Sequence, residues 1–177
     1  HFLLKAFDRV ADELQDVILV CLLRQDADKT EGRKLEKTMK RLRHIDRVVL
    51  IREKLTEEDI VAFIKGSRVV ALPFLIVPSE IPLAVIESMT LNKPVIVTET
   101  GGTSEFIGKA GKRVRQNDID GLSRSIKEVF LNEAVYQDMC QEAERIIRRQ
   151  LSWSQLASSL VDFTSDTLAA FPAPASD

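Results

Sequence analysis

The chain is poor in the residues that build disulfide frameworks and metal sites, with two cysteines and two histidines among 177 residues. Cys21 lies in an apolar run and Cys140 in a helical pattern, so both are predicted to be buried or incidental thiols of a protein in a reducing compartment. His1 and His44 have no Cys, His or acidic partners at the spacing of metal ligands. We therefore expect no metal site.

Long hydrophobic runs and a strong net charge are also missing. No apolar run reaches the ~18 residues of a membrane span, and no signal peptide is visible, which predicts a cytoplasmic protein. The net charge of −2 gives no overall reason to expect nucleic acid as a partner. A hydrophobic content of 45% and a charged content of 29% are typical of a soluble globular domain. The chain begins without an initiator Met, and we interpret it as a fragment.

Hydrophobic patterning predicts strands that alternate with helices over most of the chain. Short apolar or β-branched runs predict strands at 17–23, 48–51, 69–72, 95–98 and 113–114. Helical spacing and end signals predict helices at 2–14, 33–43, 57–65, 82–91, 103–107, 118–131, 133–150 and 152–169. This alternation predicts an α/β fold with one parallel sheet and helices on both faces. We predict a single domain over residues 1–170 and a disordered tail over 171–177.

One acid stands out within the predicted helix 82–91. Between Ile81 and Leu91 nearly every residue is apolar, yet Glu87 lies in the middle. Because a covered carboxylate is costly unless it is hydrogen-bonded, Glu87 is predicted to point into a ligand cleft. Such a carboxylate accepts two hydrogen bonds from vicinal ribose hydroxyls. The alternative is a structural acid that is bonded to nearby backbone or to a basic residue.

Two loops near Glu87 are candidates for anion binding. The turn from Ser79 to Pro82 leads into the N-terminus of a helix, where free N–H groups and the helix dipole favour a diphosphate. The alternatives are that Ser79 is an ordinary N-cap and that Glu80 only complements the dipole. After the next predicted strand, Gly101–Gly102 permits a positive φ and a close approach of the backbone to a ligand.

The predicted helix 33–43 is strongly basic. Its outer faces carry a set of cations, namely Arg33, Lys34, Lys37, Lys40, Arg41 and Arg43. Such a surface can face nucleic acid or anionic lipid, but a solvated helix face is the simpler interpretation.

Taken together, residues 79–107 resemble the donor-binding signature of the retaining glycosyltransferases of the GT-B fold, group 1 (family 4). Glu87-Ser-Met-Thr stands for the second acid of that signature and the Ala-Met-Ala that follows it. Asn92–Ile96 stands for a Gly-x-Pro-Val-Ile segment, and Asn suits the first position because it tolerates the left-handed conformation after a helix. Gly101–Glu105 matches a Gly-Gly-x-x-Glu loop.

The resemblance extends through the chain and implies a function. Leu3–Phe7 resembles the family's first helix, and Leu151–Trp153 resembles its late Phe-Ser-Trp stretch. It implies a Rossmann-like, C-terminal nucleotide-sugar-binding domain over 1–170, which serves hexosyl transfer to a glycan or lipid-linked acceptor in polysaccharide biosynthesis. The implied donor is a nucleotide-diphosphate sugar, with no metal or other cofactor. An N-terminal acceptor domain is absent from the chain, so the isolated fragment is expected to be inactive.

The resemblance also implies roles for individual residues. Glu87 would bind the ribose, and Ser79 and Glu80 would stand at the catalytic position near the donor sugar. The other donor-binding positions are Pro82, Leu83, Ala84, Thr100, Gly101, Gly102 and, near the base, Arg52.

Two departures from the family pattern leave alternatives open. Ser79 stands eight residues before Glu87, where the family has its first acid, so either Glu80 serves instead or Ser79 and backbone N–H groups hold the sugar. The family's Arg and Lys that clamp the diphosphate lie in a central strand and turn ahead of the first helix, and this chain begins after them. One alternative is a degenerate domain that binds a nucleotide or a partner without transfer. Another is a different GT-B enzyme, such as a sugar-nucleotide epimerase or a glycan phosphorylase. Peripheral membrane attachment, through the basic helix or through the missing domain, is left open as well.

Overall fold

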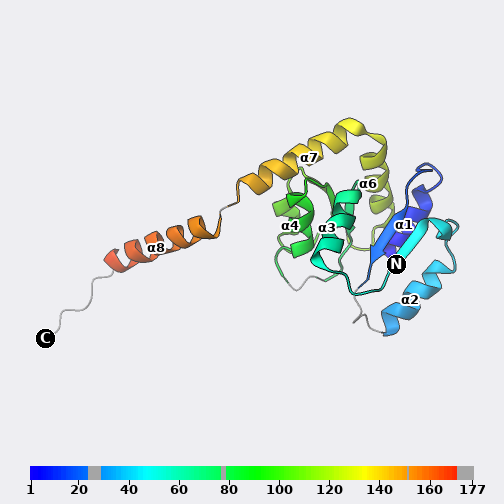
Figure 1. The fold of residues 1–177 in the computed structure, drawn as a ribbon, viewed down its shortest axis with the longest axis horizontal. Helices are drawn as coiled ribbons and strands as arrows, with labels where there is room; N and C mark the ends of the chain where they lie inside the picture. Colours follow the sequence, from blue (N-terminus) through cyan, green and yellow to red (C-terminus); the bar gives the residue numbers. More distant parts are fainter. Residues whose placement is uncertain (24–28, 77–78, 151, 171–177) are drawn as a thin grey trace. The chain divides into compact units, whose positions relative to one another are not determined.

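The computed structural model describes residues 1–23, 29–76, 79–150 and 152–170 as an α/β fold of parallel strands flanked by helices (Figure 1). The strands are β1 (Leu19–Leu22), β2 (Val48–Ile51), β3 (Val70–Leu72), β4 (Val95–Thr98) and β5 (Gly111–Val114). The helices are α1 (Phe2–Val10), α2 (Lys29–Met39), η1 (Ile45–Arg47), α3 (Glu57–Gly66), α4 (Leu83–Thr90), α5 (Thr103–Ile107), α6 (Ile119–Leu131), α7 (Glu133–Arg148) and α8 (Trp153–Ala170). The chain forms two compact units, residues 1–147 and residues 148–177. All of the described strands belong to the first unit.

The strands form two parallel sheets instead of the single sheet that the sequence predicted. β1 pairs with β2, with Leu19 opposite Val48. β4 lies between β3 and β5, and Val95 is opposite both Val70 and Gly111. Among the described residues, the outer strands β1, β2, β3 and β5 each have one side without a paired strand. Strand pairing joins segments far apart in the sequence, so hydrophobic patterning predicts the strands themselves more reliably than their grouping into sheets.

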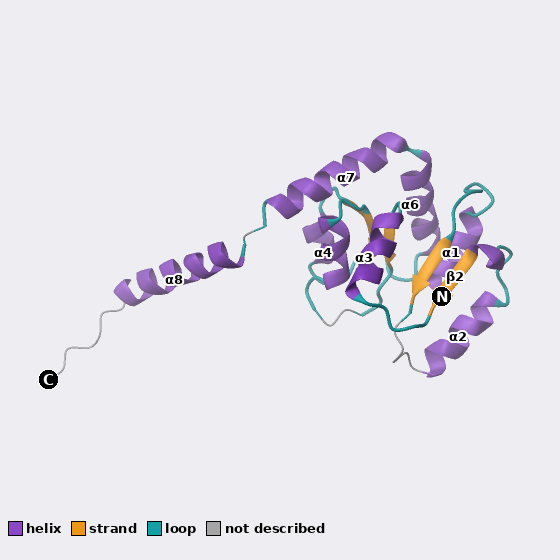
Figure 2. Cartoon of the chain, in the orientation of Figure 1, coloured by secondary structure: helices purple, strands orange, loops and turns teal. Residues whose placement is uncertain are grey.

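The core of the first unit lies on both faces of β4. Helices surround the strands of this unit, which are orange in Figure 2. Ile96 packs with α1 and α6, in a cluster that includes Val10 and Leu122. Val95 and Val97 point to the other face and pack with α4, α5 and α7. This alternation is the two-residue period of a strand that is covered on both sides. The three-stranded sheet therefore lies between two layers of helices.

Several element boundaries agree with the sequence signals. β4 and α5 have the predicted bounds. α3 begins with a capping box, in which the Asp59 backbone N–H donates to the Thr56 hydroxyl at 3.2 Å and the Thr56 N–H donates to the Asp59 carboxylate at 3.0 Å. α1 ends at Val10 rather than at residue 14, with turns following it. The predicted tail 171–177 and residue 151 lie outside the described residues.

Within the part of the chain that the structure describes, no helix combines the length and the apolar character that a membrane crossing requires.

Candidate functional site

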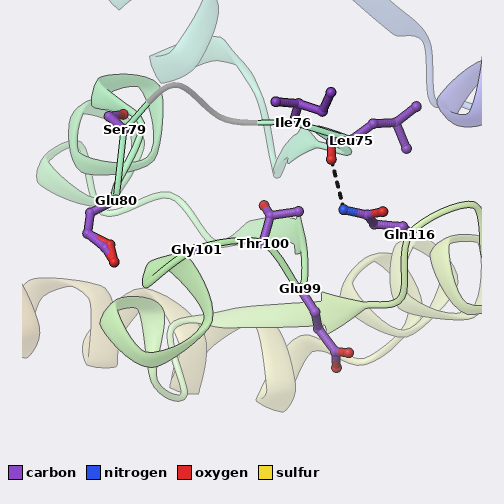
Figure 3. A pocket seen from close by; sticks show the side chains of 8 residues that line it. All are labelled: Leu75, Ile76, Ser79, Glu80, Glu99, Thr100, Gly101 and Gln116. Carbon is purple, nitrogen blue, oxygen red and sulfur yellow. Dashed lines mark hydrogen bonds between the residues drawn. The ribbon is translucent and has the colours of Figure 1, made fainter.

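A cavity of about 450 Å³ lies at the carboxyl ends of β3, β4 and β5 (Figure 3). The residues that line it come from the segments that follow these three strands, and they are Leu75, Ile76, Ser79, Glu80, Glu99, Thr100, Gly101 and Gln116. The carboxyl ends of neighbouring parallel strands meet at one edge of a sheet, which is where open α/β folds bind their ligands. The topology therefore marks this cavity as the candidate site.

Hydrogen bonds from three elements hold the segment after β3 in place. The Thr98 hydroxyl, at the end of β4, donates to the carbonyl oxygen of Phe74. The Gln116 side-chain amide donates to the Leu75 carbonyl at 2.8 Å (Figure 3). The Thr103 hydroxyl, in the first turn of α5, donates to the Glu80 carbonyl at 3.2 Å. These bonds fix the cavity wall to the sheet and to α5.

The glycine pair after β4 has two separate uses. Gly101 has a φ of +53°, a conformation that glycine adopts without strain. Gly102 has a φ of −76° and is the N-cap residue of α5. A Cβ atom at Gly102 would lie 3.5 Å from the Glu80 side chain, so Gly102 faces that carboxylate. The predicted positive φ is thus found at Gly101 alone. Gly102 allows a close approach, but the group that approaches it in this structure is the Glu80 side chain.

The N-terminus of α4 lacks a side-chain cap. Pro82 is the N-cap residue, and no side chain accepts a hydrogen bond from the first turn. The alternative that Ser79 is an ordinary N-cap is therefore wrong. Pro82 and Ala84 are half-buried, whereas Leu83 is 73% exposed. The first amides of α4 remain available to an anion.

Glu87 is exposed, which corrects the expectation of a covered carboxylate. α4 buries Val85, Ser88 and Met89 against its neighbours, and Glu87 lies on the opposite face. Leu83 lies one helical turn before Glu87 and would belong to an apolar cover over it, but Leu83 is itself largely exposed. Among the described residues, the Glu87 carboxylate has no hydrogen-bond or ion-pair partner, so the alternative of a bonded structural acid is not what this structure contains.

The structure brings some of the predicted site residues together and leaves others apart. Ser79, Glu80, Thr100 and Gly101 line the cavity, and Gly102 faces the Glu80 side chain without lining the cavity itself. The predicted positions that do not line it are Pro82, Leu83, Ala84, Glu87 and Arg52. Arg52 is exposed and follows β2, which belongs to the other sheet.

Sequence reasoning missed two polar residues of the cavity, Glu99 and Gln116. Glu99 lies between the end of β4 and the glycine pair, within a segment that was already a candidate. Gln116 follows β5, which the sequence predicted only as a short edge strand. Its position in the sequence could have identified Gln116, because a polar residue just past the carboxyl end of a parallel strand is a candidate for the ligand-binding edge of the sheet.

The cavity offers hydrogen-bonding groups of several kinds. Glu80 and Glu99 supply carboxylates, and Ser79 and Thr100 supply hydroxyl groups. Next to the glycine pair, the Ser104 hydroxyl is buried without a hydrogen-bond partner in the described part of the chain. No group of three or more His, Cys, Asp or Glu with the geometry of a metal site occurs among the residues described. Such a lining suits a ligand that is rich in hydroxyl groups.

The comparisons with known proteins agree on one fold. A glycosyltransferase from Rickettsia africae has a TM-score of 0.76 at 17% identity, over 94% of this chain and 44% of that protein. Anabaena Alr3699/HepE in complex with UDP has a TM-score of 0.77 at 19% identity, over 94% of this chain and 44% of that protein. The α,α-trehalose 6-phosphate synthase from Burkholderia multivorans has a TM-score of 0.75 at 16% identity, over 96% of this chain and 40% of that protein. This chain spans less than half the length of each, and it shares their α/β fold, that of the GT-B glycosyltransferases.

Sequence comparison gives the family. No curated protein matches the chain significantly. The family described as "Glycosyl transferases group 1" matches residues 1–132, which include every strand of the described structure and the whole candidate site. The chain therefore belongs to the group 1 glycosyltransferases.

Proposed function

We propose that this chain is the donor-binding part of a retaining glycosyltransferase, and that it binds a nucleotide-diphosphate sugar at the cavity beyond β3, β4 and β5. The observation that carries the proposal is the meeting of the Ser79–Glu80 and Thr100–Gly101 segments at that edge. These are two of the segments in which the sequence resembles the donor signature. Structural neighbours include Alr3699/HepE in complexes with UDP and with UDP-glucose, which supports a nucleotide sugar as the ligand class.

The diphosphate is proposed to lie between two groups of backbone amides. One group is the uncapped first turn of α4, with the N–H groups of Leu83 and Ala84. The other consists of the Gly101 and Gly102 N–H groups in the loop that leads into α5, where the Thr100 N–H already donates to the Thr98 carbonyl at 2.8 Å. Free N–H groups and the positive end of a helix dipole stabilise an anion, and they stabilise it further as negative charge develops on a departing nucleoside diphosphate.

The remaining roles are those that the family resemblance implies. Glu87 is proposed to accept hydrogen bonds from the two ribose hydroxyls, for which its exposed carboxylate is free. Ser79 and Glu80 are proposed to lie against the donor sugar, and the segment that begins at Arg52 is proposed to approach the base. Transfer with retention would proceed through an oxocarbenium-like transition state without a metal, to a glycan or lipid-linked acceptor held by a separate domain. We therefore expect this chain alone to bind donor weakly and to transfer no sugar.

A thermal-shift titration of the chain with UDP, GDP, ADP and their sugars tests the binding proposal. A ligand at 100 times its dissociation constant adds roughly 2.7 kcal/mol of stability, which is a readily measured shift. A shift with the nucleotides of one base would identify the base. If no nucleotide raises the unfolding midpoint of this chain, the same titration on a chain that carries the strand ahead of α1 tests whether that strand is needed for binding. Absence of a shift there as well would contradict the proposal.

Substitution of Glu87 by Gln tests the ribose contact. We expect nucleotide affinity to fall about ten- to hundredfold, because a pair of charge-assisted hydrogen bonds becomes at best a weaker neutral pair. The unfolding midpoint without ligand should stay unchanged, since Glu87 is exposed and has no partner among the described residues. Glu36→Gln is the matched control, because Glu36 is an exposed helical glutamate on α2. Lost folding without a specific loss of affinity would instead make Glu87 a structural acid.

Ser79 stands where the family has its first acid, and this difference supports a second candidate function. In that case the chain is a degenerate domain that binds a nucleotide but no longer uses the sugar. Ser79 and Glu80 line the cavity side by side, so the structure contains both candidates for the sugar contact. In the degenerate domain, a nucleoside diphosphate and its sugar conjugate would shift the unfolding midpoint equally. In a donor site, the sugar conjugate should bind more tightly and Glu80→Gln should remove that difference.

A further inference from the structure

The outer face of α2 carries a basic stripe that the proposed donor site does not use. Residues 29–43 contain seven Lys or Arg and two Glu, although the whole chain has a net charge of −2. The stripe consists of four exposed cations, Arg33, Lys37, Lys40 and Arg41. The first three are spaced by four and three residues, and Arg41 follows directly after Lys40, so these side chains share one side of the helix and the turn after it.

The opposite side of α2 is the side that packs. Leu35, Met39 and Leu42 are half-buried, and Thr38 is buried with its hydroxyl donating to the Lys34 carbonyl at 2.8 Å. The basic stripe is therefore the solvent face of an amphipathic element, which leaves its charges available to a partner.

The segment after α2 is fixed to α1 by its own ionic contacts. The Arg43 guanidinium donates to the Asp12 carboxylate at 3.0 Å, and its backbone N–H donates to the Asp8 carboxylate at 2.8 Å. The His44 ring lies between the same two carboxylates, 2.7 Å from Asp12 and 3.2 Å from Asp8. Arg43 is thus engaged within the protein, and it joins the end of the basic stripe to α1 and to the turn that follows α1.

Two exposed isoleucines lie at the same end of the β1–β2 sheet as the carboxyl end of α2. Ile18 directly precedes β1 and is 61% exposed, and Ile45 precedes β2 in η1 and is 42% exposed. Because β1 and β2 are parallel, with Leu19 opposite Val48, both isoleucines lie at the amino end of this sheet. α2, in light blue in Figure 1, follows β1 and ends just before η1, so its carboxyl end is at this end too.

We propose that this basic and apolar surface docks the protein on an anionic lipid bilayer. Lysine and arginine side chains are attracted to the negative surface potential of such a membrane, and exposed apolar side chains insert into its interfacial region. The phosphate backbone of a nucleic acid would use the cations but has no use for Ile18 and Ile45. The presence of both features at the amino end of the β1–β2 sheet is what favours a membrane.

Vesicle co-sedimentation of the 177-residue chain tests the proposal. The chain should bind vesicles of phosphatidylcholine that contain phosphatidylglycerol, should not bind phosphatidylcholine alone, and should be released by salt. The variant Arg33→Gln/Lys37→Gln/Arg41→Gln should bind about 100-fold more weakly, since each cation near an anionic surface contributes about fivefold. No binding by the parent chain, or equal binding by this variant, would overturn the proposal.

Two comparisons give the test its specificity. The matched control Lys65→Gln/Lys109→Gln/Arg124→Gln removes three exposed cations from elsewhere in the first unit. It should leave vesicle binding nearly unchanged, and an equal loss would show that overall charge, not the α2 surface, is what binds. The variant Ile18→Ser/Ile45→Ser should weaken binding to vesicles and leave binding to heparin unchanged. Unchanged vesicle binding by this variant would overturn the membrane assignment in favour of a soluble polyanion.

Discussion

At the scale of single residues, burial changes the chemistry of one thiol. Cys21 lies on β1, and desolvation raises its pKa from a usual value of 9.0 to about 11. The protonated thiol is therefore favoured in the folded state over a wider pH range than in the unfolded chain. The stability that this contributes is fully present below about pH 9 and is lost as the pH rises toward 11, because there the unfolded chain releases its proton first.

The raised pKa of Cys21 predicts slow alkylation. In a Cys140→Ser background, which leaves Cys21 as the one thiol of the sequence, iodoacetamide at pH 8 should modify the folded chain roughly a hundredfold more slowly than the unfolded chain. The rate in the folded chain should keep rising with pH up to about 11. Mass spectrometry of quenched samples measures both rates, and a plateau near pH 9 in the folded chain would contradict the assignment.

At the scale of elements, the contact between β4 and β5 requires a residue without a side chain. Gly111 lies opposite Val95, and a Cβ atom there would lie 2.8 Å from the Val95 carbonyl oxygen and 2.7 Å from the Ile107 side chain. Backbone cannot move aside as the end of a flexible side chain does, so Gly111→Ala should destabilise the chain by about 1–3 kcal/mol. Gly32→Ala is the control, because nothing lies within 4 Å of its added Cβ. This change in α2 should raise the free energy of unfolding by up to about 1 kcal/mol. Urea unfolding measures both variants, and a change of the same sign in their free energies of unfolding would refute the argument.

Elements bounded by strong local signals were predictable, whereas exposure and pairing were not. Pro94 and the glycine pair bracket β4, and its predicted bounds are the observed ones. The exposure of Glu87 depends on which face of α4 meets the sheet, and the residues between Ile81 and Leu91 are too uniformly apolar to show it. Gln116 reaches the cavity only because β5 pairs beside β4, a non-local contact that spacing along the chain does not reveal.

At the scale of the whole molecule, the two sheets differ in how well they are enclosed. All four residues of β4 are buried, and β4 has a partner strand on each side. β1 and β2 have only each other among the described residues, and none of their residues is fully buried. Amide protection follows the burial and pairing of backbone hydrogen bonds, so the first unit should contain regions of unequal local stability.

Hydrogen–deuterium exchange should resolve this difference. We expect peptides that cover 95–98 to exchange only at the rate of global unfolding, whereas peptides that cover 19–22 and 48–51 exchange through faster local opening. The family resemblance predicts a central strand ahead of α1, and we expect that strand to bond to the sides of β1 and β3 that have no paired strand among the described residues. A chain that carries this strand should therefore show slower exchange at 19–22 and 70–72, with little change at 95–98, where both sides are already paired. Equal exchange in the two chains would mean that the added strand does not pair with β1 and β3.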